Sequence, residues 1–170
     1  MTTIPAGYHA VTPWIIAKGA TELVDFMKEA FGAEEAEGSR MTNEDGTISH
    51  VELKIGDSVV MAFDAKEDWP DTPAFLRLYV KNGDATYERA LRAGASSVTE
   101  MTNLPFGDRV GRVRDAWGNI WWIHEHIEDV AADDMTDRMS DPTAIEAMRY
   151  VEETLNGELG SRLVKVRRAH

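Results

Sequence analysis

Two short apolar stretches of the sequence contain side chains that can move a proton or bind an ion. His50 and Glu52 lie two positions apart in one stretch, and His124 lies in the other. Alternate residues of a β-strand point to the same side, so His50 and Glu52 share one face of their strand. An imidazole near a carboxylate can act as a general base, bind a divalent metal, or form a hydrogen-bonded polar floor. His50 and Glu52 are therefore the candidate catalytic residues, and the polar-floor role stays open beside them.

Both stretches belong to predicted β-hairpins. His50–Ile55 and Ser58–Phe63 flank the dipeptide Gly56-Asp57, which suits a two-residue turn. The second hairpin joins Gly107–Arg114 to Ile120–His126 through a turn at residues 115–118, where Asp can bond its own backbone and Gly accepts positive φ. The two-residue turn sets a register that pairs residue 55 with 58, 54 with 59, 52 with 61 and 50 with 63.

The same order of elements precedes each hairpin. The predicted elements are a strand Val11–Ala17, a helix with Thr21 as N-cap that stops at Gly32, and a strand Glu34–Arg40, then a strand Phe75–Val80, a helix region Asn82–Gly94 and a strand Ser96–Met101. Ala30 corresponds to Ala90 and Phe31 to Leu91, a period of 60 residues. This spacing indicates an internal duplication. The sequence predicts an α+β fold of two βαβββ modules, about residues 8–64 and 74–128.

These motifs resemble the vicinal oxygen chelate superfamily, the glyoxalase, bleomycin-resistance and dioxygenase group, and above all its PhnB-like branch. The matching stretches are Val11–Trp14, Phe26–Glu34, His50–Met61 and Gly107–His126, within roughly residues 8–128. The resemblance implies that each sheet has one face covered by its helix and another that, with the second module, encloses a ligand in a cup. We call that second face the cup face.

Strand alternation and the resemblance together divide the side chains between these faces. The aliphatic set Val51, Leu53, Ile55, Val60 and Ala62 suits the helix side, as do Trp121 and Ile123. The ligand pocket implied for the cup face is lined by Trp14, His50, Glu52, Met61, Phe63, Phe75, Arg77, Tyr79, Trp122 and His124. Trp14 and Trp122 should approach each other across the cup.

Metal-dependent members of the group hold an ion with His, Glu or Gln ligands on four strands. Carried over, those positions fall on Thr12, Met61, Phe75 and Trp122. Divalent metals in such sites need imidazole or carboxylate ligands, which these residues lack. The resemblance therefore implies no metal at the usual site and no cofactor. A metal held by His50, Glu52 and His124 is the alternative.

Aromatic side chains on the cup face suggest the function. Trp14, Phe63, Phe75, Tyr79 and Trp122 lie beside Arg77, a combination that favours a flat, partly apolar ligand. We expect a bleomycin-resistance-like protein that binds a small organic molecule. One alternative is an enzyme of lyase, isomerase or dioxygenase type that uses His50, Glu52 or His124. A second is an interaction or regulatory module that acts through the C-terminal extension.

Composition limits the partners and the compartment. The formal charge of −12 argues against nucleic acid and anionic membranes, and no apolar run is long enough for a membrane span. The chain has no cysteine and no recognisable signal peptide, which fits a cytoplasmic protein. The resemblance implies a homodimer.

Residues 129–170 form a predicted C-terminal extension beyond the domain of residues 1–128. An acidic polar connector leads to a helix that Ser140 or Asp141 caps, with Pro142 in its first turn. Its apolar stripe is Ala144, Met148, Val151 and Leu155, and Asn156-Gly157 should end it. A short amphipathic helix is marginal alone, so we expect it to pack on the body or on a second chain.

Overall fold

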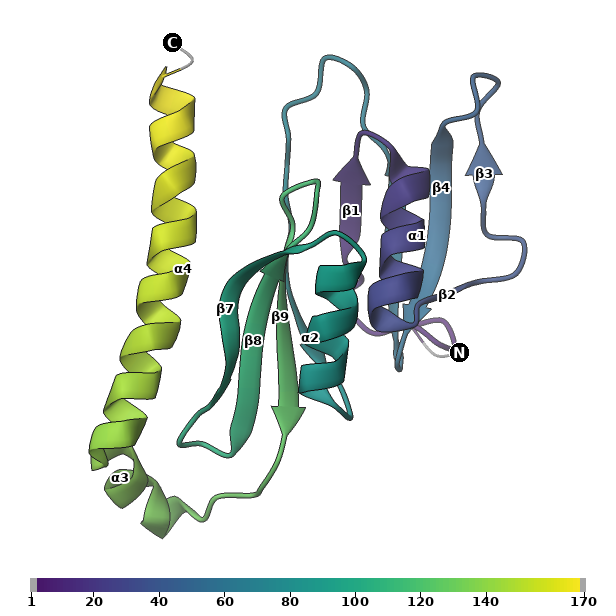
Figure 1. The fold of residues 1–170 in the computed structure, drawn as a ribbon. Coiled ribbons are helices and arrows are strands. Elements are labelled where there is room, and N and C mark those ends of the chain that lie inside the picture. The colour runs from purple at the N-terminus through teal and green to yellow at the C-terminus, as the bar shows by residue number, and fades with distance from the viewer. Residues whose placement is uncertain (1–2, 169–170) are drawn as a thin grey trace.

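Two modules, each a β-sheet with one helix on it, stand side by side, and a long helix flanks the second (Figure 1). The structure is a computed structural model that describes residues 3–168, with side chains as far as residue 160. Helices α1 and α2 pack against each other, and each covers the helix side of its own sheet. The predicted α+β fold of two βαβββ modules with a C-terminal helix is confirmed.

The first module contains a sheet in the order β1-β5-β4-β2, and β3 pairs with β4 at its side. Its elements are β1 Trp14–Ala17, α1 Ala20–Phe31, β2 Glu34–Glu35, β3 Met41–Thr42, β4 Ile48–Ile55 and β5 Ser58–Asp64. The two-residue turn works as predicted, because Ile55 pairs with Ser58 and Glu52 with Met61. Every residue of the aliphatic set on the helix side is buried, so the predicted division of faces is confirmed for this hairpin.

The second module repeats this connectivity in a sheet ordered β6-β9-β8-β7. Its elements are β6 Phe75–Tyr79, α2 Gly83–Arg92, β7 Ser96–Asn103, β8 Asp108–Arg114 and β9 Ile120–His126. The first and last strands of each module pair in parallel, β1 with β5 and β6 with β9. Asn82 caps α2 by accepting a hydrogen bond from the Ala85 amide. The shared pairing pattern agrees with the duplication read from the 60-residue period.

The turn between β8 and β9 is built around the buried carboxylate of Asp115. Its Oδ1 accepts from the amides of Trp117 and Asn119, at 3.0 and 2.9 Å. Its Oδ2 accepts from Asn119 Nδ2 and from the indole Nε1 of Trp121, at 2.8 and 2.9 Å. Burial raises the pKa of Asp115, and these four donors oppose the rise. The turn thereby fixes Trp121 toward α1, where its ring contacts Phe31.

Three of the predicted element ends in the first module are wrong. Strand β1 begins at Trp14 rather than Val11. Helix α1 begins at Ala20, one residue before Thr21. Asp64, at the end of β5, supplies the cap instead, because it accepts hydrogen bonds from the amides of Gly19 and Ala20 at 2.9 Å. The predicted strand Glu34–Arg40 is only Glu34–Glu35, followed by a loop in which Arg40 pairs with Glu35.

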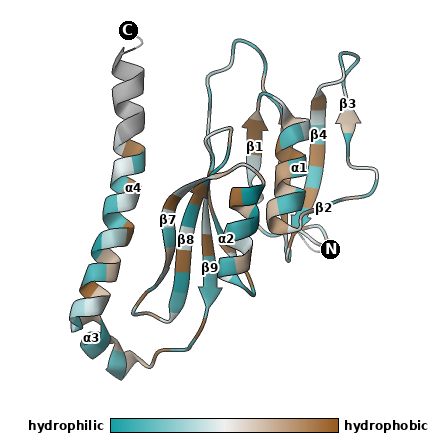
Figure 2. Cartoon of the chain, viewed as in Figure 1, coloured by the Kyte–Doolittle hydropathy of each residue, from teal (hydrophilic) through white to brown (hydrophobic). Residues whose placement is uncertain are grey.

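The C-terminal extension is more helical than predicted. The acidic connector contains α3, Ala132–Ser140, which is hydrophilic and has no buried residue (Figure 2). Helix α4, Pro142–Arg168, runs on through Asn156-Gly157 rather than ending there. Asp141 accepts from the Thr143 amide at 2.8 Å, the cap that the sequence proposed. Of the predicted stripe, Val151 is buried and the other members are partly buried. Along residues 3–168 no helix is long and apolar enough to cross a membrane.

Candidate functional site

On the cup face of the first sheet, His50 and Glu52 do meet. His50 Nε2 lies 3.2 Å from Glu52 Oε1, and the hydroxyl of Tyr8 donates to Glu52 Oε2 at 2.5 Å. The hydrogen bond from Tyr8 is the main cause that lowers the pKa of Glu52, and the hydrogen bond with His50 lowers it further. Burial acts in the opposite direction but is weaker than the hydrogen bond from Tyr8. Glu52 is therefore an anion that receives two polar partners. The sequence missed Tyr8, which precedes β1 and reaches Glu52 only through the fold.

Aromatic rings continue along the same face. The Trp14 ring lies 6.0 Å from that of His50 and 5.4 Å from that of Phe63, both edge-on. Phe63 in turn meets Trp69 at 6.1 Å. Trp69 comes from the linker between the modules, which the sequence treated as a polar connection. Phe63, Trp69 and Lys66 border a cavity of about 760 Å³, so the linker extends the aromatic surface.

The second sheet organises its cup face around Asp108. This buried carboxylate accepts from Tyr79 at 3.1 Å, from His124 Nδ1 at 2.9 Å and from His126 Nδ1 at 2.8 Å. Arg77 Nε can only donate, and it lies 3.0 Å from His124 Nε2. His124 therefore carries its proton on Nδ1, and burial lowers its pKa, so the ring is neutral. His126 was expected in solvent, and it is half exposed although Asp108 holds it.

Trp122 stands between two arginines. The guanidinium carbon of Arg77 lies 4.9 Å from its ring centroid and that of Arg112 lies 4.1 Å away. Phe75 stacks with it at 6.2 Å and an interplanar angle of 10°. Arg112 is 2% exposed, and burial lowers its pKa to about 10. The sequence missed Arg112, although it pairs with Trp122 in register and so had to share its face.

Helix α4 covers part of this cup face. Val151 packs with Val110 and Leu104, and Met148, Tyr150 and Trp122 border the same cluster. Arg112 Nη1 donates to the Val151 carbonyl at 2.8 Å, and the Tyr150 hydroxyl accepts from the Glu100 amide at 3.0 Å. The expectation that the helix packs on the body is confirmed. Its place on the cup face of the second sheet was not foreseen.

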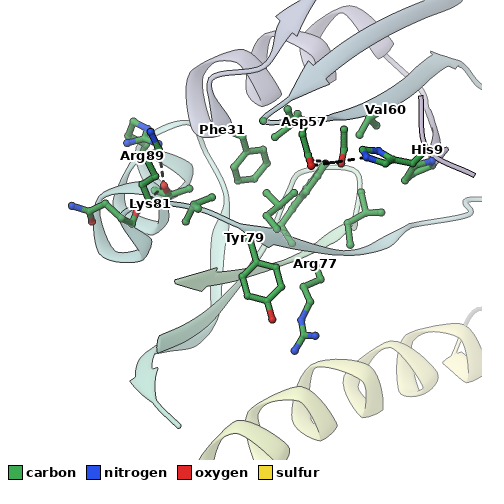
Figure 3. Close-up of a pocket in the computed structure, with 18 of the residues that line it drawn as sticks. His9, Phe31, Asp57, Val60, Arg77, Tyr79, Lys81 and Arg89 are labelled. Atoms are coloured by element: carbon green, nitrogen blue, oxygen red, sulfur yellow. Dashed lines mark hydrogen bonds and ion pairs between the residues drawn. The ribbon is translucent and has the colours of Figure 1, made fainter. Parts of the chain in front are cut away.

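A cleft of about 850 Å³ separates the modules near β6 (Figure 3). Phe31, Asp57 and His9 lie on one side of it, and Arg77 and Tyr79 point away from them toward α4. Ring contacts within the described residues join Trp14 to His50 and Phe63, and Trp122 to Phe75 and His124, but none joins the two tryptophans. The prediction that Trp14 and Trp122 approach each other is therefore wrong for the described residues of one chain.

The two sets of titratable residues also stay apart. His50 and Glu52 lie on the first sheet, whereas His124 is held by Asp108 and Arg77 on the second. Across residues with described side chains, no cluster of three His, Asp or Glu groups could hold a metal ion. The alternative ligand set of His50, Glu52 and His124 is therefore not assembled by one chain.

Paired βαβββ modules with polar and aromatic residues on the faces opposite their helices define a glyoxalase-like protein. A profile of the glyoxalase/bleomycin resistance protein/dioxygenase superfamily matches residues 8–123. The chain belongs to this superfamily. Thr12, Met61, Phe75 and Trp122, the positions expected from the resemblance to correspond to the metal ligands, carry a hydroxyl, a thioether and two aromatic rings. Such a set lacks the imidazole and carboxylate groups that the usual divalent ion prefers.

Sequence relatives and solved structures agree with this assignment. The uncharacterized protein Rv0887c of Mycobacterium tuberculosis is 32% identical over 142 residues, which cover 77% of this chain and 82% of that protein. The uncharacterized protein Mb0911c of Mycobacterium bovis has the same identity and is covered to 92%. TioX from Micromonospora sp. ML1 superposes with a TM-score of 0.59 at 24% identity, covering 70% of this chain and 99% of TioX. A glyoxalase/bleomycin resistance protein/dioxygenase family enzyme from Burkholderia phytofirmans PsJN gives a TM-score of 0.57 at 16% identity, covering 68% and 97%. These structures share the fold.

Proposed function

We propose that this protein binds a small, flat organic molecule between aromatic side chains of its cup faces, without the usual metal of its superfamily. The observation that carries the proposal is the exposure of large rings: Trp14 is 54% exposed, Phe75 52% and Tyr79 60%. Rings that served only as core would be buried. An exposed group of rings rimmed by polar residues is typical of a binding surface. The bleomycin-resistance-like members of the superfamily and the PhnB-like branch are the functional neighbours that this proposal favours.

Tryptophan fluorescence tests the proposal. A panel of flat aromatic compounds is titrated into the full chain, and some members should quench fluorescence saturably. Phe75→Ala should weaken that binding about fivefold, since ring stacking contributes on the order of 1 kcal/mol. Ile145→Ala, an exposed apolar residue on α4, is the control and should bind like the parent. A panel without a saturable quencher removes the support for this function.

Elemental analysis tests the metal-free part. The purified chain should contain no stoichiometric zinc, nickel, manganese or iron, because the ligand positions hold residues that do not fit these ions. About one such ion per chain, lost in His50→Ala, would overturn this part and favour the enzyme alternative.

A second chain should complete the cup. β1 and β6 are the outer strands of their sheets, and each carries exposed rings on its cup face. An open strand edge beside apolar surface favours pairing with another chain. We therefore propose a cytoplasmic homodimer in which Trp14 of one chain faces Trp122 of the other. Light scattering coupled to size exclusion should give twice the chain mass, and a monomer at micromolar concentration contradicts the proposal.

One observation favours the enzyme alternative. Tyr8, Glu52 and His50 form a hydrogen-bonded row on an accessible face, the kind of arrangement that transfers protons. If the chain turns over a ligand found in the panel, Tyr8→Phe and Glu52→Gln should each lower kcat, with KM little changed. Unchanged kcat in both variants leaves this row as a polar floor.

A further inference from the structure

Three buried N–H donors on the second sheet make no hydrogen bond within the described part of the chain, and they are Nε of Arg112, Nε of Arg114 and Nε1 of Trp122. Arg112 and Trp122 are the pair that lie together. The two side chains touch, since the guanidinium carbon lies 4.1 Å from the indole centroid. Buried donors without acceptors are rare and costly. A pair of them in one place points to an acceptor that binds there.

Among the residues with described side chains, Arg112 has no ion-pair partner. Its Nη1 donates to Thr99 Oγ1 at 3.1 Å and to the Val151 carbonyl at 2.8 Å, and both acceptors are neutral. Arg114, two residues along the same strand, differs, because Glu158 of α4 lies 3.2 Å from its Nε. Asp108 is occupied by Tyr79 and two histidines. A buried guanidinium without a paired charge favours an anion as its partner.

The surroundings also favour a flat ring. Phe75 is stacked on Trp122 and is 52% exposed, so one aromatic surface is open to a ligand. Arg77 uses only its Nε in the hydrogen bond to His124. The Arg77 side chain is exposed, and its guanidinium lies over the Trp122 ring. Met148 and Trp122, at the edge of α4, are each only partly buried. A methionine side chain adapts its shape easily, so it can give way there.

We infer that Arg112 Nε and Trp122 Nε1 bind the carboxylate of a flat aromatic ligand whose ring lies against Phe75. This inference rests on the proposed function and names its ligand class, an aromatic carboxylate. Arg77 supplies a second cationic contact from β6. Helix α4 stays in place and forms the wall that excludes water from the carboxylate, where a charge-assisted hydrogen bond is strongest.

Nuclear magnetic resonance of the nitrogen-15-labelled full chain tests the inference with benzoate as the probe. Two resonances should shift saturably with benzoate, the indole N–H of Trp122 and the Nε–H of Arg112. The indole resonance is assigned by its disappearance in Trp122→Phe. Benzamide has the same ring without the charge and should bind at least tenfold more weakly. Arg112→Lys keeps the charge but removes Nε, and it should weaken benzoate about tenfold, as expected for a lost charge-assisted hydrogen bond.

Two controls separate binding from folding. Arg109→Lys alters an arginine on the opposite face of the same strand, paired with Asp84, and should leave benzoate affinity unchanged. Trp122→Phe keeps a ring but no donor, so it should weaken benzoate even if Arg112→Lys fails to fold. Benzoate that shifts neither resonance, or binds equally to Arg112→Lys or to Trp122→Phe, overturns the inference. If a neutral ring compound shifts the Trp14 resonance while benzoate does not shift the Arg112 resonance, the carboxylate site is wrong and the proposed function is still supported.

Discussion

The centres of the two cup faces are built at equivalent positions from opposite chemistry. In the first sheet, register places Trp14 opposite Met61 and Met61 opposite Glu52. In the second, it places Arg77 opposite Trp122 and Trp122 opposite Arg112. One row therefore reads ring, thioether and carboxylate, and the other reads guanidinium, indole and guanidinium. Duplication preserved the scaffold while the two faces took opposite charge.

The two faces also differ in their covering. Glu52 on the first sheet is partly exposed and takes its partners from Tyr8 and His50. Arg112 on the second is buried under α4. A partly exposed charge is solvated by water, whereas a buried one depends on its neighbours. The second face should therefore respond much more strongly to substitution, and the following predictions test this difference.

The largest effect is expected where α4 meets the second sheet. Val151→Lys places an unpaired ammonium against Val110 and Leu104 and beside the Arg112 guanidinium, so the helix should undock from its sheet. The free energy of unfolding should fall by about 3 kcal/mol or more, as for other buried unpaired charges. Ile145→Lys on the same helix is the matched control at an exposed position and should change stability by less than about 0.5 kcal/mol. Denaturant unfolding measures both, and equal losses would mean that α4 is not docked through Val151.

A direct contrast of the two rows comes next. Arg112→Ala removes the contact with Trp122 and two hydrogen bonds, and should cost about 2–4 kcal/mol. Glu52→Ala at the equivalent position should cost about 1 kcal/mol or less, because water replaces its partners. Arg112→Met retains the volume without the buried charge and should recover most of the loss. Equal costs at the two positions, measured by thermal unfolding, would refute the contrast.

A smaller effect is expected from the hydroxyl of Tyr8. Tyr8→Phe removes one hydrogen bond to Glu52 and should lower stability only slightly, because water can replace the lost partner. The same bond is the main cause that lowers the pKa of Glu52, so that pKa should rise toward its ordinary value. Carbon-detected titration of the Glu52 carboxyl measures the shift directly, and an unmoved pKa would assign the lowering to His50 instead.

The two modules should respond to pH in different ranges. His126 has a raised pKa, chiefly through Asp108 and then Asp129, so its stabilisation is complete below its ordinary value of about 6.5 and is lost as pH rises through the folded value. His124 has a lowered pKa, so its contribution has the opposite sign and is lost as pH falls below about 6.5. Glu52 has a lowered pKa, and its contribution is lost only in acid, below about 4.3.

Unfolding curves between mildly acid and mildly alkaline pH check this contrast. The stability difference between the parent and His126→Asn should shrink as pH rises through neutrality. The difference for Glu52→Gln should stay constant over that range. If both variants follow the same pH dependence, the separate titration of the modules is wrong.

Local rules were enough for the hairpins. Gly56-Asp57 set the register of β4 with β5. The resemblance, which placed Trp121 against the helix and Trp122 on the cup face, agrees with the complete burial of Trp121. The cap of α1 needed a contact between distant residues. Asp64 replaces Thr21 as the cap across about 45 residues of chain, and no local pattern marks such a cap.

The site residues divide in the same way. Those on the first predicted hairpin were assigned a face by strand alternation, and those on the last strand by the resemblance. Tyr8 and Trp69 were missed because loops bring them back onto the first sheet. Asp108 and Arg112 were missed for another reason: their strand was predicted but its polar residues were not assigned a face. Register with Trp122 and His124 was the signal that could have found them.

The Asp115 turn makes β9 intolerant of changes in length. Trp121 and Trp122 are neighbours on this strand and point to opposite faces. The carboxylate of Asp115 holds Trp121 in the core by accepting a hydrogen bond from its Nε1. One residue inserted between Asp115 and Ile120 would exchange Trp121 with Trp122 and turn every later side chain over. Variation in this lineage should therefore proceed by substitution within β9. Insertions and deletions should collect in the linker at residues 65–73, where a changed loop reshapes the binding surface without reversing a strand.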